Sequence, residues 1–346
     1  MKEVTFGHEE RPGANGEETR CEDADRPDAA VRLRVTVLVP TFKRPDDLAR
    51  CLDALFLQTR KPDGVIVVVR DSDGDTSQML DGIGAAARGI RKVIVSAPGQ
   101  VHALNAGLAR IQTDVVAITD DDAAPHADWV QRIMEHFESR CDLGGVGGRD
   151  RMHYGGVLVT GRAAVVGKTP LIGKHIGNHH LGFGAPRFVH MLKGVNGAYR
   201  TRAIRGVGFD TRLHGTGAQV HWEISLGIAL RRRGWKLLYD PAILVDHYLG
   251  ERFDEDKRNT FNSLALTNMA YNETLVRMDQ LSPFGSIVFL VWAIGVGTRV
   301  TPGLVQCVRF APAEGSLAIA KLRSAIAGRL EAWKDARSTA RQPSGS

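Results

Sequence analysis

Short apolar runs alternate with amphipathic helical patterns through the first third of the chain, and this order constrains the fold more than any other feature. The apolar runs have the length of buried strands, and the segments between them place apolar residues on one helical face. The predicted strands are residues 34–40, 65–69, 92–96 and 115–119, and the predicted helices are 46–57, 79–88 and 101–111. This alternation predicts an α/β fold with a mostly parallel central sheet and helices on both faces.

Polar and acidic residues follow three of the predicted strands. They are Thr41–Arg44, Arg70–Asp73 and Asp120–Asp122. In open α/β sheets, ligands bind beyond the carboxyl ends of the strands. We therefore expect these three segments to surround one binding site.

The run Asp120-Asp121-Asp122 is the sharpest candidate for chemistry. Three adjacent carboxylates repel one another, which is costly unless a cation neutralises them. Carboxylate oxygens select hard ions such as Mg²⁺ or Mn²⁺, which also bind the phosphates of a substrate. Taken alone, the run fits an acidic turn that caps a helix near Asp128 about equally well.

The acidic run is one of several motifs that occur in a fixed order and spacing. These motifs are Val37–Arg44, Val67–Asp73, Leu104–Gly107, Ala117–Pro125, Lys193–Arg200 and Glu223–His247. Together they resemble glycosyltransferase family 2, which has the GT-A fold, over roughly residues 34 to 250. The resemblance implies an inverting enzyme that uses Mg²⁺ or Mn²⁺ and a nucleotide-diphosphate sugar donor, usually a UDP-sugar. The expected product is a single sugar transferred to a saccharide or lipid-linked acceptor, in cell-envelope or exopolysaccharide synthesis.

The resemblance also implies roles for individual residues. The expected metal ligands are Asp122 and His247, with Asp120 contacting the metal or the ribose. Glu223 occupies the position of the catalytic base, which would take a proton from the acceptor hydroxyl. The residues expected to contact the nucleotide are Pro40, Thr41, Arg44, Asp71, Asp73, Asn105, Asp120 and Asp121.

Two positions depart from the family's usual residues. The family commonly shows Asp-Asp-Gly-Ser where this chain has Arg70-Asp71-Ser72-Asp73, and Glu-Asp where it has Trp222-Glu223. The first difference concerns the residues that face the base, so it bears on which nucleotide is bound. The second lengthens the expected base by one methylene group.

Composition divides the chain into three expected parts. Residues 1–32 are polar and predict a disordered tail, 33–255 the GT-A domain, and 256–341 a C-terminal helical region. An apolar stretch at 284–298 is shorter than the ~20 residues of a membrane-spanning helix. Residues 317–341 have the pattern of a basic amphipathic helix, which suits an anionic membrane surface. A core helix followed by a solvated terminal helix is the alternative interpretation.

Charge and cysteine usage limit the partners and the compartment. The net charge of +6 is mild, and no zinc-finger spacing or RNA-binding signature accompanies it, so we expect no nucleic acid partner. Four scattered cysteines and the lack of a secretory pattern predict free thiols and a cytoplasmic location, at the inner face of the cell membrane. A non-catalytic nucleotide-sugar-binding or membrane-docked assembly protein is an alternative function, and a nucleotidyltransferase is a weaker one.

Overall fold

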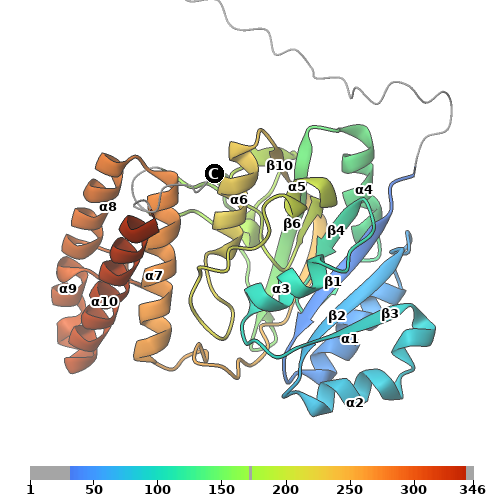
Figure 1. The fold of residues 1–346 in the computed structure, drawn as a ribbon, viewed down its shortest axis with the longest axis horizontal. Helices are drawn as coiled ribbons and strands as arrows, with labels where there is room; N and C mark the ends of the chain where they lie inside the picture. Colours follow the sequence, from blue (N-terminus) through green and yellow to red (C-terminus); the bar gives the residue numbers. More distant parts are fainter. Residues whose placement is uncertain (1–31, 171–173, 340–346) are drawn as a thin grey trace, which may run out of the picture. The chain divides into compact units, whose positions relative to one another are not determined.

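The first half of the central sheet is parallel, as predicted. The computed structural model describes residues 32–170 and 174–339. The strands β1 (Val35–Thr41), β2 (Gly64–Arg70), β3 (Ile90–Val95) and β4 (Val115–Ile118) lie in the order β3-β2-β1-β4. All three pairings among them are parallel, so their carboxyl ends meet at one edge (Figure 1).

The second half of the sheet is mixed, and the sequence patterns did not predict most of it. It continues β4-β9-β6-β10-β5, with β9 antiparallel to both of its neighbours and β6 parallel to β10. Its longest strands have 12 residues each, and β10 ends at His247. The bounds are β5 (Ala123–Pro125), β6 (Leu143–Tyr154), β7 (Val157–Leu158), β8 (Arg187–Val189), β9 (Gly197–Arg200) and β10 (Lys236–His247).

Helices cover both faces of this sheet, as the α/β prediction requires. On one face, apolar residues of α1 (Pro45–Phe56), α2 (Gly74–Gly82) and α4 (Trp129–Ser139) pack in one core cluster. On the other face, α3 (Gln100–Leu108) and α6 (Trp222–Arg232) join a second cluster. Short helical segments complete the order: η1 (Ala85–Arg88), η2 (His179–Leu181) and α5 (Thr201–Arg205).

Four helices follow the sheet: α7 (Ser263–Gln280), α8 (Pro283–Gly295), α9 (Leu304–Glu314) and α10 (Ser316–Thr339). The predicted boundary at residue 255 falls in the loop between β10 and α7. Helix α10 packs along α7 through small residues, so closely that a Cβ on Gly328 would lie 2.1 Å from the carbonyl oxygen of Thr267. Among the described residues, we find no helix that is both long and apolar enough to cross a bilayer.

One of the three cysteines in the described residues differs from expectation. Cys51 and Cys307 are free and buried, in agreement with the prediction of free thiols. Cys141 is disulfide-bonded, so the prediction of four free thiols is wrong. The predicted N-terminal tail lies outside the described residues, apart from Arg32.

Candidate active site

A cavity of about 570 Å³ opens where the strands β1, β2, β4 and β10 end. Its wall is built from segments that are far apart in the sequence and that the sheet topology brings together. Seven of the predicted site residues line it: Pro40, Thr41, Arg44, Asp120, Asp122, Glu223 and His247. Residues from all three segments that were expected to surround one site line this cavity: Thr41 and Arg44 after β1, Arg70 at the end of β2, and Asp120 and Asp122 after β4.

Asp122, Asp120 and His247 form the candidate metal site. One potential ligand atom from each residue lies within 4.8 Å of the others. Asp122 Oδ2 accepts hydrogen bonds from Arg44 Nη1 at 2.9 Å and from the Gly250 amide at 2.7 Å. Asp122 Oδ1 is buried, has no hydrogen-bond donor in the described part of the chain, and lies 3.4 Å from His247 Nε2. A buried carboxylate oxygen left over in this way, beside a second carboxylate and an imidazole, fits a divalent cation such as Mg²⁺ or Mn²⁺.

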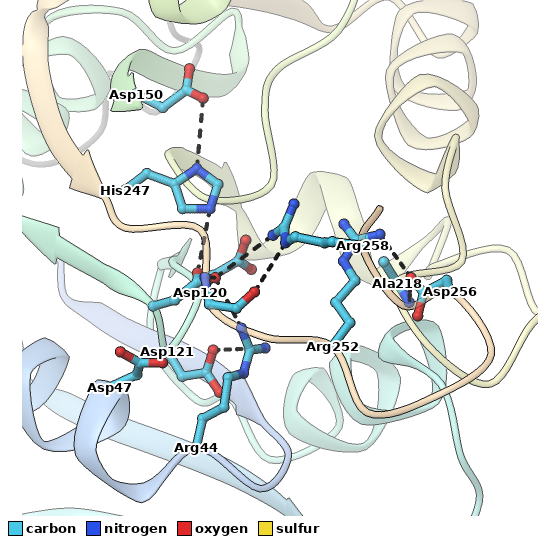
Figure 2. A network of polar contacts seen from close by, with 12 residues as sticks. Arg44, Asp47, Asp120, Asp121, Asp150, Ala218, His247, Arg252, Asp256 and Arg258 are labelled. Atoms are coloured by element: carbon cyan, nitrogen blue, oxygen red, sulfur yellow. Dashed lines mark hydrogen bonds and ion pairs between the residues drawn. The ribbon is translucent and has the colours of Figure 1, made fainter. Parts of the chain in front are cut away.

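Ion pairs of Arg44 connect the loop after β1 to the run Asp120–Asp122. Its guanidinium contacts Asp121 and Asp122 at 2.9 Å each, as Figure 2 shows for Asp121. Asp121 is fully buried and does not line the cavity. Its position indicates that it orients the guanidinium of Arg44, which lines the cavity.

Burial and neighbouring charges separate the pKa values of this cluster. Burial raises the pKa of Asp121 to about 7, although Arg44 opposes the rise. Burial and then Asp122 also raise the pKa of Asp120. Burial alone would raise the pKa of Asp122, but His247 and Arg44 hold it well below its usual range. Burial would lower the pKa of His247, yet the neighbouring carboxylates of Asp122 and Asp150 raise it to about 9.

Asp150 is a site residue that the sequence patterns missed. It lies in β6, is buried, and places a carboxylate oxygen 3.9 Å from His247 Nδ1 (Figure 2). A carboxylate on the far nitrogen of a metal-binding histidine fixes the ring's orientation and strengthens it as a ligand. The only signal in the sequence was an acidic residue at the end of a glycine-rich segment, and this does not identify a strand.

Glu223 lies in the first turn of α6 and lines the same cavity. Lys193 Nζ donates a hydrogen bond to Glu223 Oε1 at 3.1 Å. Burial would raise the pKa of Glu223, but Lys193 lowers it below its ordinary value. The carboxylate is therefore ionised at neutral pH and ready to accept a proton. Lys193 belongs to a motif noted in the sequence, although we had not assigned it a role there.

A short chain of hydrogen bonds connects this helix to the acidic run. Trp222 Nε1 donates to Gln100 Oε1 at 3.3 Å, and Gln100 Nε2 donates to Asp120 Oδ1 at 3.2 Å. Trp222 is buried and packs edge-to-face on Phe209. Gln100 thus sets the distance between the start of α6 and the metal-site carboxylates.

Besides Asp121, three more of the predicted nucleotide contacts do not line the cavity. Asp71 is exposed, and Asp73 accepts a hydrogen bond from the Thr76 amide as the N-cap of α2. The Asn105 side chain donates to and accepts from the backbone of Phe209 at 2.8 and 2.9 Å, which fastens α3 to the loop before α6. Their nucleotide-binding roles stay predictions.

Arg70 occupies the cavity wall where the family usually has a carboxylate. Its guanidinium lies 3.8 Å from the centre of the Phe42 ring and pairs with Asp254 at 2.9 Å. All three residues line the cavity. A flat cation stacked on an aromatic ring is a surface on which a planar base can pack.

Comparison with known structures defines the class of protein. The chain resembles the mannosyltransferase PcManGT from Pyrobaculum calidifontis in complex with GDP-Man and Mn²⁺, with a TM-score of 0.50, 16% identity and 88% of each chain covered. It also resembles GalNAc-T7 with UDP, GalNAc and Mn²⁺, with a TM-score of 0.52, 11% identity, and 71% and 48% of the two chains covered. At these identities the likeness is one of fold, and the fold is that of GT-A glycosyltransferases.

The family follows from the sequence. The model of the glycosyltransferase-like family 2 matches residues 32–263, which is more than half of the chain. The chain therefore belongs to this family.

Curated relatives match shorter segments. A glucosyl-dolichyl phosphate glucuronosyltransferase from Haloferax volcanii is 25% identical over 118 residues, covering 34% of this chain and 38% of the relative. The galactofuranosyltransferase GlfT1 from Mycobacterium tuberculosis is 38% identical over 96 residues, covering 25% and 30%. These matches span well under half the length of either relative.

Proposed function

We propose that this protein is a metal-dependent, inverting glycosyltransferase that moves a single sugar from a nucleotide-diphosphate donor to a saccharide or lipid-linked acceptor. One observation carries the proposal. The Asp120–Asp122–His247 cluster and the Glu223 carboxylate line the same cavity, one suited to a cation and the other to a proton.

The donor end would be held by the acidic cluster. A divalent ion bound by Asp120, Asp122 and His247 would stabilise the negative charge of the departing diphosphate. Arg44 keeps Asp122 ionised and oriented, and Asp150 orients His247. Pro40 and Thr41 lie at the end of β1 in the same wall and are positioned to contact the nucleotide.

The acceptor end would be served by Glu223. Its carboxylate would accept the proton of the acceptor hydroxyl while that oxygen attacks the anomeric carbon. Attack from the side opposite the leaving diphosphate inverts the anomeric centre. The hydrogen bond from Lys193 keeps Glu223 ionised and fixes its direction.

We propose a UDP-sugar as the donor, and a role in cell-envelope or exopolysaccharide synthesis at the cytoplasmic face of the membrane. Family resemblance favours uracil, and the fold neighbour GalNAc-T7 binds UDP while PcManGT binds GDP-Man. The dolichyl phosphate in the name of the Haloferax volcanii relative supports a lipid-linked acceptor.

A donor panel tests the proposal. The full chain is incubated with Mn²⁺ or Mg²⁺, a saccharide acceptor and a set of UDP-sugars plus GDP-mannose, and nucleotide release and the anomeric configuration of the glycoside product are followed by NMR. We expect metal-dependent release of UDP from one sugar and a product of inverted configuration. Binding of a nucleotide sugar without turnover of any donor would instead favour a non-catalytic binding protein, and a retained configuration would refute the inverting mechanism.

A further inference from the structure

An exposed apolar face lies on the outer pair of C-terminal helices, away from the active-site residues. Helices α8 and α9 pack against each other, and Figure 1 draws them on the outer side of α7 and α10. On α8 the exposed side chains include Phe284, Ile287 and Val291, at the spacing of one helical face. On α9 they include Leu304, Val305 and Val308, again on one face. Phe284, Val291 and Val308 are 76%, 69% and 74% exposed.

The protein holds this face in a fixed position. Gly297 and Pro302 form a bridge that closes the turn between α8 and α9. Arg329 of α10 is buried and donates hydrogen bonds to the carbonyl oxygens of Thr301 and Pro302, at 2.6 and 3.1 Å. Thr301 Oγ1 in turn donates to Glu273 of α7 at 2.7 Å. A buried polar network of this kind fastens the turn to the rest of the helices, while the apolar side chains point outward.

The unpaired charges beside this face are cationic. From Gln280 to Ala313 the only charged residues are Arg299 and Arg309, both exposed, and Glu314 at the end of α9 pairs with Lys321 at 2.8 Å. An exposed apolar surface flanked by these two arginines is complementary to a lipid bilayer with anionic headgroups. With 13 and 11 residues, α8 and α9 are too short to cross a bilayer of ~30 Å, so they suit a position in the interface plane.

The same charges argue against self-association. In a symmetric dimer the face would meet its own copy, which brings Arg299 and Arg309 near like charges, while Glu314, the acidic residue of α9, is already paired with Lys321. We infer that the α8–α9 face docks this protein on an anionic membrane surface, with the apolar side chains inserted at the headgroup boundary. The inference rests on the surface and not on the transferase reaction.

Co-sedimentation of the full chain with vesicles tests the inference. The vesicles are phosphatidylcholine alone, or phosphatidylcholine mixed with phosphatidylglycerol. We expect binding to the anionic vesicles, and a loss of roughly tenfold or more in partitioning for the double variant Phe284→Asp/Val308→Asp. The control is Leu57→Asp/Val157→Asp, which alters two side chains that are 74% and 70% exposed elsewhere, and should bind like the wild type.

Charge reversal tests whether the two arginines attract the anionic headgroups. Light scattering tests whether the face instead forms a dimer. Arg299→Glu/Arg309→Glu should weaken binding to anionic vesicles by roughly tenfold or more while leaving weak binding to neutral ones unchanged. Metal-dependent donor hydrolysis in free solution should be unaltered in all of these variants, which keeps a failed docking surface distinct from a failed enzyme. Absence of wild-type binding to either vesicle, equal loss in the control, or a dimer that dissociates in Phe284→Asp/Val308→Asp without any change in vesicle binding would overturn the inference.

Discussion

Carboxylates lie at both ends of the cavity, but their surroundings suit them to different ligands. At the donor end, three carboxylates crowd together, two of them buried, and Arg44, Arg258 and His247 lie close to them. At the acceptor end, one carboxylate stands beside one lysine. The first arrangement leaves a buried carboxylate oxygen without a hydrogen-bond donor in the described part of the chain, which favours a cation. The second leaves a single ionised base, which favours a proton.

The two ends also differ in how firmly they are held. Asp122 and His247 stand at the ends of neighbouring elements of the sheet, joined by a hydrogen bond from the Tyr248 amide to the Asp122 carbonyl oxygen at 2.9 Å. Glu223 stands at the start of a helix that is connected to this region through Trp222, Gln100 and Asp120. The metal site is therefore preformed by strands, and the base is positioned relative to it by side chains.

Removing the carboxylate of Asp122 should have the largest effect on turnover. In Asp122→Ala, both the ligand atom and the acceptor for Arg44 and Gly250 are lost. We expect turnover to fall by roughly a thousandfold or more, because the metal contributes several kcal/mol of charge stabilisation. Calorimetric Mn²⁺ titration and nucleotide release measure the change. Asp75→Ala, an exposed carboxylate on α2, serves as the control, and unchanged Mn²⁺ affinity in Asp122→Ala would place the metal elsewhere.

Removing the lysine should change the pH dependence at the acceptor end. Glu223 works as a base only when ionised, so activity falls as the pH drops through its pKa. Lys193 lowers that pKa, so Lys193→Met raises it and moves the acid limb of the kcat/KM profile to higher pH, by about tenfold in rate at acid pH for each pH unit moved. Lys193→Arg should keep the wild-type limb. A profile that falls uniformly without moving would indicate only a structural role.

Metal binding should depend on pH through His247. The pKa of about 9 belongs to the metal-free chain, and a metal ion needs the neutral ring. At pH values below 9 the ion must displace a proton, so Mn²⁺ affinity should rise as pH rises, by roughly tenfold per pH unit between about 6.5 and 8.5. His247→Asn should flatten this slope and weaken Mn²⁺ binding, and an unchanged Mn²⁺ affinity in His247→Asn would exclude His247 as a ligand.

The smallest effect on catalysis is expected at Asn105. The structure uses its side chain to pair with the Phe209 backbone, so Asn105→Ala should reduce the free energy of unfolding by about 1–3 kcal/mol through unpaired polar groups. The donor KM should stay near the wild-type value. Urea unfolding and steady-state kinetics check both, with Gln78→Ala, an exposed amide on α2, as the control. A raised donor KM at an unchanged free energy of unfolding would instead support a nucleotide contact by Asn105.

The parallel half of the sheet was predictable because its signals are local. Each strand from β1 to β4 is a short apolar run, and α1 places Leu48, Leu52 and Leu55 on one buried face. The strands end at polar residues, and the parallel topology then brings those ends together. Family resemblance added Asp122, His247 and Glu223, which lie too far apart in the sequence for spacing alone to connect.

The glycine-rich half was not predictable because contacts with residues far away in the sequence determine which residues fit there. Strand β6 has no alternating apolar pattern, since a Cβ on Gly148 would lie 2.0 Å from the carbonyl oxygen of Ile243, and one on Gly144 2.5 Å from Trp235. Close packing against β10 excludes side chains at these positions. The register of that pairing then sets Asp150 opposite Val245 and near His247, which no local pattern reveals.

The division of labour between the two ends is tested most directly by Glu223→Gln. This change removes the base and keeps the size of the side chain, and Gln can still hydrogen-bond near Lys193. We predict that Mn²⁺ and donor affinities stay within about twofold, while the single-turnover rate of sugar transfer falls by about 10²- to 10⁴-fold. Undiminished transfer with intact binding would contradict the assignment of proton transfer to Glu223. The separation of this function from metal binding by Asp120, Asp122 and His247 would then fail as well.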